Sequence, residues 1–296
     1  MLLNNQISLK TYETVQEFVD EATHSLLLHE VQNTFLLLAT QQALKEASPD
    51  FYCNAVWDSQ DKFVFALFSL NNTMLYGSFL PKENAEAVNM ALNDFIHAKA
   101  YVSLTFIHGF QPALSCMQNC LQTILKLKLV DPVWSYDNKQ VEYSPEVLQL
   151  VQSPNIELKT GTEKDMPLLL KWTQGFQDDV LRNFDASMLP PVQEAVSGAL
   201  KEQAIYLLYV DDLPVSMAWK RRPTFNGIAI TLVYTPPSER KNNYGSVCTG
   251  MLTELLLKEF KFVTLFVTKH QNPEKNLYTS VGFKFLGEAG RLVVGI

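Results

Sequence analysis

The stretch that decides the fold is VYTPPSERKNNYGS, residues 233–246. An apolar run, Ile228–Val233, leads into it and stops before two consecutive prolines, which cannot continue a sheet ladder. From Val247 onward, apolar residues recur at the spacing of one helical turn. The pattern predicts a strand, a loop and an amphipathic helix in that order.

The loop that enters this helix has the features of an anion site. Unpaired N–H groups and the positive end of the helix dipole attract anions. Arg240 and Lys241 add positive charge, and Gly245 lets the backbone approach a ligand closely. It is not a Walker-type loop, because no Gly-Lys-Ser/Thr closes it. A strand-to-helix loop with solvated charges explains the same residues, so the loop alone leaves both readings open.

A second motif, NPEKNLYTSVGF at residues 272–283, follows a strand predicted at Phe262–Thr268. Asn272 is a candidate N-cap, with Pro273 at the first helical position. Gly282 suits the position just after a helix. The sequence therefore predicts a short helix between Asn272 and Gly282.

Together, the two motifs resemble the acyl-CoA-binding core of the GNAT superfamily of N-acetyltransferases, over Asn155–Ile296. The resemblance implies acetyl-CoA as co-substrate. Two positions depart from the family pattern: Asn243 stands where a glycine is usual, and Asn272 lies one residue closer to Tyr278 than expected. Asparagine tolerates positive φ, so the loop can still form. The cofactor-binding residues that the resemblance implies are Leu232, Val233, Tyr234, Thr235, Arg240, Lys241, Asn242, Asn243, Tyr244, Gly245, Ser246, Asn272 and Asn276.

The resemblance also gives Tyr278 the role of general acid. Attack of an amine on a thioester expels a thiolate, and a phenol that is protonated at neutral pH can supply the proton. Packing at the strand–helix junction is the alternative role for this ring. Residues 232–235 would present backbone N–H and C=O groups to the thioester and the pantetheine arm, unless a neighbouring strand pairs with them.

A general base is harder to find, because the strand Ile228–Val233 carries no carboxylate. Glu239, Asp178 and Asp179 lie in segments that can border an acceptor site, but exposed acidic surface is the favoured account of each. A water chain, or an amine that arrives neutral, would serve instead.

The chain as a whole predicts an α/β protein in two halves. Both halves contain two helices, a hairpin, a strand, a helix and a strand, which suggests an internal duplication. The resemblance to the GNAT superfamily implies two tandem acetyltransferase-like halves, each a mixed, mostly antiparallel twisted sheet flanked by helices. The predicted domains are 1–145, a degenerate half, and 155–296, the acyl-CoA-binding half. No acyl-CoA site is expected in the first half, because its loop at residues 81–84 has no glycine.

Composition restricts the class of partner. With 47% hydrophobic and 19% charged residues over 296 positions, the chain is typical of a soluble globular protein. A net charge of −7 and a pI near 5.3 argue against nucleic acid, whose phosphates would be repelled. Neither a signal peptide nor a membrane span is expected. The four cysteines lack metal-ligand spacing, so we expect free thiols in the cytoplasm and no metal.

We therefore predict an N-acetyltransferase that moves an acetyl group from acetyl-CoA to a primary amine by direct attack. The expected partner is a small amine or a peptide amine, and the expected state is a monomer or a homodimer. The alternative is a non-catalytic CoA-binding or protein-interaction module that retains the fold. Asn243 and the short spacing from Asn272 to Tyr278 are the changes that favour this alternative.

Overall fold

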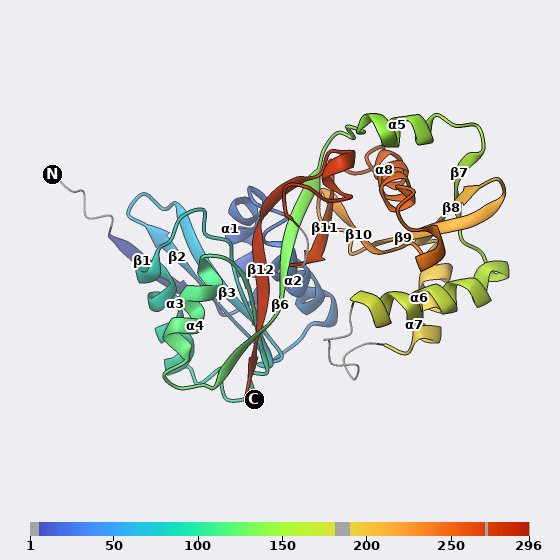
Figure 1. Ribbon diagram of the computed structural model, residues 1–296. Helices are drawn as coiled ribbons and strands as arrows, with labels where there is room; N and C mark the ends of the chain where they lie inside the picture. Colours follow the sequence, from blue (N-terminus) through green and yellow to red (C-terminus); the bar gives the residue numbers. More distant parts are fainter. Residues whose placement is uncertain (1–5, 181–189, 270–271, 296) are drawn as a thin grey trace. The chain divides into compact units, whose positions relative to one another are not determined.

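The computed structural model describes residues 6–180, 190–269 and 272–295 (Figure 1). The chain divides into two compact units. Unit 1 comprises Met1–Val133 and Gly287–Ile296, and unit 2 comprises Trp134–Leu286. Two strands, β6 (Leu127–Asn138) and β12 (Lys284–Val294), contribute residues to both units.

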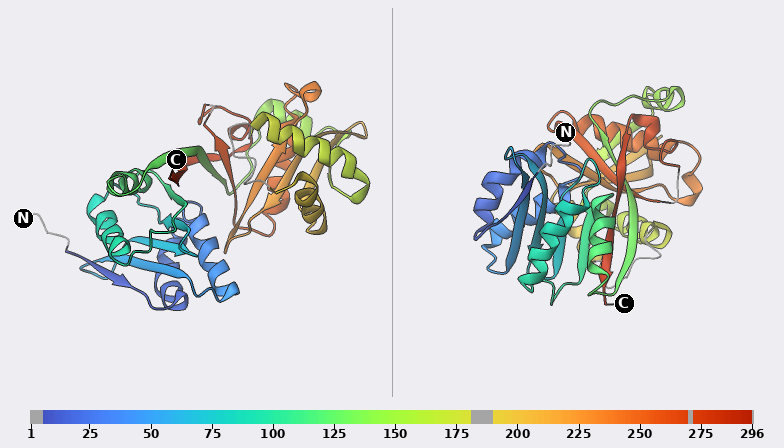
Figure 2. Two further views of the ribbon diagram at one scale, coloured as in Figure 1. Left: turned by 90° about the horizontal axis from the view of Figure 1, so that it is seen from below. Right: turned by 90° about the vertical axis from the view of Figure 1, so that its left-hand side faces the viewer.

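Unit 1 has helices on both faces of one sheet (Figure 2). Its strands run in the order β1-β2-β3-β4-β5-β12, and β6 is the next neighbour of β12. The pair β4–β5 is parallel, whereas β1–β2, β2–β3, β3–β4 and β5–β12 are antiparallel. Besides its parts of β6 and β12, the elements of unit 1 are β1 (Ile7–Thr11), α1 (Val15–Leu27), α2 (Thr34–Glu46), β2 (Phe51–Asp58), β3 (Phe63–Leu70), β4 (Met74–Gly77), α3 (Ala85–His97), β5 (Phe106–Phe110) and α4 (Ala113–Leu121).

The central strand β3 shows why both faces of this sheet are covered. Phe65 and Leu67 belong to the core that α3 and α4 cover, whereas Ala66 and Phe68 belong to the core that α1 and α2 cover. All four side chains are fully buried. Successive side chains of a strand point to opposite faces, so a strand buried on both sides is a continuous apolar run.

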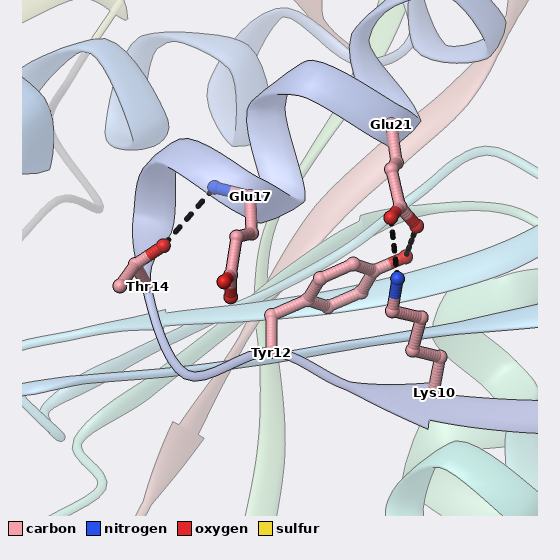
Figure 3. A network of polar contacts seen from close by, with 5 residues as sticks. All are labelled: Lys10, Tyr12, Thr14, Glu17 and Glu21. Carbon is pink, nitrogen blue, oxygen red and sulfur yellow. Dashed lines mark hydrogen bonds and ion pairs between the residues drawn. The ribbon is translucent and has the colours of Figure 1, made fainter.

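A polar network ties β1 to α1 in unit 1 (Figure 3). The Thr14 hydroxyl accepts a hydrogen bond from the Glu17 N–H at 3.1 Å and so caps the helix. The Tyr12 hydroxyl donates to the Glu21 carboxylate at 3.1 Å, and Lys10 pairs with the same carboxylate. Burial raises the pKa of Tyr12, so this phenol keeps its proton and remains a donor.

Unit 2 also has helices on both faces of its sheet. Its strands run in the order β6-β11-β10-β9-β8-β7, with β10–β11 parallel. Helices α5 and α8 cover one face, and α6 and α7 cover the other. The elements are α5 (Pro145–Val151), β7 (Ile156–Thr160), the 3₁₀ helix η1 (Glu163–Asp165), α6 (Met166–Val180), α7 (Val192–Lys201), β8 (Ile205–Val210), β9 (Leu213–Arg221), β10 (Gly227–Tyr234), the 3₁₀ helix η3 (Pro237–Glu239), α8 (Tyr244–Leu256), β11 (Phe262–Thr268) and the 3₁₀ helix η4 (Thr279–Val281).

The two units repeat one order of elements. In unit 1 the order is β1-α1-α2-β2-β3-β4-α3-β5, and in unit 2 it is β7-α6-α7-β8-β9-β10-α8-β11. The parallel pair stands at the same place in both, β4–β5 and β10–β11. The predicted fold class, two halves with mixed and mostly antiparallel sheets flanked by helices, is confirmed.

The predicted domain boundaries differ from the two units. The stretch between the two predicted domains, residues 145–155, contains α5, whose Val147 is buried in the core of unit 2. At the other end, Ala289–Val293 pair antiparallel with β5, so residues after Leu286 belong to unit 1. Any strand that reaches a sheet edge can pair with it, so chain order does not fix which sheet a terminal strand joins.

All four cysteines are free, and three of them are buried. Cys248 lies on the buried side of α8, where burial raises the pKa of its thiol to about 12. Its role is core packing, as expected from its place on the apolar stripe.

Within the described residues, no helix combines the length and the apolar character that crossing a membrane requires.

Candidate active site

The strand β10 leaves its parallel neighbour early and then bulges. Its pairing with β11 runs from Gly227 to Ala229. On its other side it pairs with β9, and the register shifts between Thr231 and Tyr234. Leu232 lies within this shift with a φ of 44°, which is uncommon for a residue other than glycine. A bulge takes backbone groups out of the ladder, so this part of β10 can present N–H and C=O groups to a ligand.

Hydrogen bonds within the protein occupy two carbonyls at the end of β10. The Ser216 hydroxyl donates to the Tyr234 carbonyl at 3.1 Å and lies 2.9 Å from the Thr235 hydroxyl. The Thr235 carbonyl accepts from Arg240 Nε at 2.9 Å. In the predicted ligand-facing stretch, residues 232–235, the Tyr234 and Thr235 carbonyls therefore already have partners within the protein.

A left-handed turn leads directly into α8. Lys241 and Asn243 have φ of 71° and 60°, and Asn243 is the N-cap residue of the helix. The prediction that asparagine can replace glycine here by adopting positive φ is confirmed. The Asn243 side chain makes no capping hydrogen bond, so it does not compete for the first N–H groups of α8. Those groups remain available to an anion.

Glycine at position 245 allows a close approach at the start of α8. A Cβ atom there would lie 3.3 Å from the Thr235 hydroxyl. At the next residue, the Ser246 hydroxyl donates to the Leu277 carbonyl at 3.1 Å and accepts from the Ser280 hydroxyl at 3.0 Å. The structure thus brings the two predicted motifs into direct contact.

Arg240 is engaged within the protein. Its guanidinium pairs with Asp179 near the end of α6 and lies 5.7 Å from the centre of the Tyr234 ring. Arg240 is expected from the sequence to offer its positive charge to a phosphate. In the structure that charge is already paired with the Asp179 carboxylate. Lys241 is exposed and has no ion pair among the residues that the structure describes. Asn242 donates to the Glu239 carbonyl at 3.3 Å and so holds the loop.

Two of the three acidic candidates for a general base already have partners within the protein. Asp179 is the partner of Arg240. Asp178 accepts a hydrogen bond from Gln174 Nε2 at 2.9 Å, one helical turn earlier on α6. Glu239 is half-buried in η3. No position among the three stands out for proton abstraction.

The prediction of a helix between Asn272 and Gly282 is wrong. The chain forms turns there, followed by the short 3₁₀ helix η4. Asn272 does not cap a helix, because its side chain accepts from the Glu274 N–H at 2.9 Å and closes a local turn. Gly282 ends η4 with a φ of 92°, as predicted for a residue after a helix.

Asn276 explains why this segment does not become a regular helix. Its Oδ1 accepts from the Tyr278 and Thr279 N–H groups, at 2.9 and 3.2 Å. Its Nδ2 donates to the Asn272 carbonyl at 2.9 Å. Asparagine side chains compete in this way with backbone hydrogen bonds, so the short turn replaces helical ones. With its amide engaged in this way, Asn276 is a structural centre of the segment.

Tyr278 is half-buried against the core that α8 covers. Its ring centre lies 6.3 Å from that of Tyr136 and 6.4 Å from that of Phe283. Burial, and secondly the Tyr136 phenol, raises the pKa of Tyr278 above its ordinary value. Its hydroxyl makes no hydrogen bond within the described part of the chain. A phenol in this state keeps its proton at neutral pH and has it available for donation.

Two residues that hold the site were missed by sequence reasoning. Ser216 anchors the end of β10, and Tyr136 contacts the second motif from β6. Nothing in the local sequence distinguishes either from an ordinary strand residue. Their roles depend on which strands become neighbours.

Two solved structures share this architecture over almost the whole chain. A GCN5-related N-acetyltransferase from Sphaerobacter thermophilus aligns with 97% of this chain and 94% of its own, with a TM-score of 0.56 and 10% identity. A GNAT-family acetyltransferase from Colwellia psychrerythraea aligns with 98% of this chain and 100% of its own, with a TM-score of 0.52 and 8% identity. The chain has the GNAT fold.

At such low identity the likeness concerns the fold and not the reaction. By sequence, no protein-family model and no curated protein matches the chain. The strand, loop and helix that the first motif predicts are present as β10, the turn at Asn243 and α8.

Proposed function

We propose that unit 2 is a cytoplasmic N-acetyltransferase that moves an acetyl group from acetyl-CoA to the primary amine of a small molecule or peptide, as a monomer or homodimer. The observation that carries the proposal is the left-handed turn at Asn243. The uncapped start of α8 follows it, and the bulge of β10 precedes it. An anion site beside free backbone groups suits a ligand with phosphates at one end and an amide-containing arm.

In the proposed reaction, the N–H groups of Tyr244, Gly245 and Ser246 hold the pyrophosphate of acetyl-CoA. The backbone of Leu232 and Val233 orients the pantetheine arm and polarises the thioester carbonyl. The amine nitrogen attacks the carbonyl carbon, so that a C–N bond forms and the C–S bond breaks. Tyr278 gives its proton to the departing thiolate, and the proton that the amine loses returns to Tyr278 through water.

Calorimetry with the full chain tests binding of the donor. We expect acetyl-CoA and CoA to bind, and Asn243→Asp to weaken the affinity by about tenfold or more, roughly 1.4 kcal/mol. Aspartate keeps the shape and the tolerance of positive φ, but it places a negative charge where the pyrophosphate would bind.

The matched control is Asn72→Asp. Asn72 also adopts a left-handed conformation, with a φ of 52°, but it lies in unit 1. The same change there should leave the affinity unchanged. No binding by the wild-type chain, or equal weakening in both variants, contradicts the site.

A non-catalytic CoA-binding module is the second candidate. The observations that favour it are the missing helix after β11 and the pairing of Arg240 with Asp179. Either change can weaken catalysis and leave the fold intact. Release of free CoA from acetyl-CoA across a panel of amines separates the candidates. Amine-dependent release supports the enzyme, whereas binding without release supports the module.

A further inference from the structure

Tyr136 places a phenol in the middle of the Tyr278 segment. It lies on β6 within unit 2 and is fully buried. Its backbone carbonyl accepts from the Thr264 hydroxyl at 2.7 Å, which fixes it to the neighbouring strand β11. Its hydroxyl donates to the Pro273 carbonyl at 2.9 Å and accepts from Asn276 Nδ2 at 3.0 Å. One rigid strand residue therefore contacts two residues of the segment that carries Tyr278.

The Asn276 side chain links Tyr136 to Tyr278 through two hydrogen bonds. One end of its amide bonds to the Tyr136 hydroxyl, and the other accepts the backbone N–H of Tyr278 at 2.9 Å. The path from β6 to the Tyr278 backbone thus consists of two hydrogen bonds. The Tyr278 carbonyl in turn accepts from the Val281 and Phe283 N–H groups, at 3.1 and 3.2 Å, and its ring centre lies 6.3 Å from that of Tyr136. Buried, satisfied polar networks favour one conformation over others.

We propose that Tyr136 and Asn276 are positioning residues, which hold the Tyr278 hydroxyl in the direction needed to protonate the leaving thiolate. The proposal rests on the function proposed above for Tyr278. Neither residue takes part in proton transfer. Their contribution is to reduce the set of ring positions, so that the acid lies within hydrogen-bond reach of the sulfur more of the time.

The variant Tyr136→Phe tests the proposal, because it keeps the ring and removes the hydroxyl. We expect kcat for acetyl transfer to fall about tenfold, with the KM for acetyl-CoA unchanged, since orientation contributes to the transition state. In the Tyr278→Phe background, the same substitution should cause no further loss, because the group that it positions is gone. Equal losses of kcat in both backgrounds overturn the proposal.

The control for loss of a buried hydroxyl is Tyr52→Phe in unit 1. Tyr52 is 8% exposed, and its hydroxyl contacts Asp94 and accepts from Asn54 Nδ2 at 2.7 Å. This variant should lose stability and keep kcat. A fall in kcat as large as that of Tyr136→Phe would mean that general destabilisation, and not position, accounts for the effect.

Hydrogen exchange separates failure of this inference from failure of the proposed function. If the wild-type chain has no acetyltransferase activity, the proposed function is wrong. The positioning role of Tyr136 and Asn276 is then judged from the backbone amides of residues 277–280. In Tyr136→Phe and in Asn276→Ala these amides should exchange faster, while those of α1 stay unchanged. If exchange at residues 277–280 is unchanged in both variants, the positioning role of Tyr136 and Asn276 is overturned, whether or not the chain is an active enzyme.

Discussion

At the scale of single residues, the Tyr278 hydroxyl is the group on which the proposed chemistry depends. Burial raises its pKa, so the hydroxyl is protonated across the neutral range and has a proton to give. We predict that Tyr278→Phe lowers kcat by about a hundredfold, the lower end of general acid contributions, with little change in the Kd of acetyl-CoA. Steady-state kinetics and calorimetry measure the two quantities.

Tyr143→Phe is the control for that variant. Tyr143 also packs against α8, where its ring occupies the space beside Gly250. Loss of its hydroxyl should leave kcat near the wild-type value. A Tyr278→Phe variant with full turnover would remove the phenol from the mechanism and leave only its packing role.

His108 makes a separate prediction at the residue scale, about stability. Its ring lies between Phe35, at 5.4 Å, and Tyr76, at 5.5 Å, and its register partner on β12 is Arg291. Burial, and secondly the charge of Arg291, lowers the pKa of His108 to about 4. Between its ordinary pKa near 6.5 and about 4, the unfolded chain binds a proton that the folded chain does not.

The free energy of unfolding should therefore fall as the pH drops through that window, and His108→Phe should remove this part of the fall. The difference in Tm between the variant and the wild-type chain, followed from pH 8 to pH 4, measures the effect. We expect the difference to move in favour of the variant below about pH 6.5. A difference that stays constant with pH would contradict the burial of a neutral imidazole.

At the scale of elements, local patterns predicted the first motif well and the second poorly. The strand β11 has the bounds expected from its apolar run, and α8 begins directly after the loop. Proline, glycine and apolar periodicity are local signals, and they determine these elements. The positive φ of Asn243 was also predictable, because few residue types tolerate it.

The segment after β11 could not be predicted from the same signals. Asn272 and Pro273 match a helix start, but Asn276 bonds to a phenol from a strand 140 positions earlier. Local propensity is weak compared with such a contact, so the tertiary environment decided the conformation. The engagement of Arg240 by Asp179 has the same origin, since the two residues lie on different elements.

At the scale of the whole molecule, the order of the sequence does not predict that the last strand, β12, pairs with β5 of unit 1. Leu292 lies on β12, pairs with Ile107 of β5 and is fully buried in the core of unit 1. We predict that Leu292→Ala lowers the free energy of unfolding by about 2–5 kcal/mol, because it removes a buried side chain and leaves a cavity. Denaturant unfolding measures the loss, and Leu213→Ala, at a position 67% exposed, should change it by about 0.5 kcal/mol or less.

Hydrogen exchange then locates the effect of Leu292→Ala within the chain. Because residues after Leu286 belong to unit 1, protection should fall in β5 and α4, which contribute to the same core, and persist in α8 of unit 2. Equal loss of protection in α8 and β5 would contradict the assignment of the C-terminal strand to unit 1. Loss confined to unit 1 would mean that the chain's last residues stabilise its first half. Dividing the chain before residue 155 would then remove from that half the strand that pairs with β5.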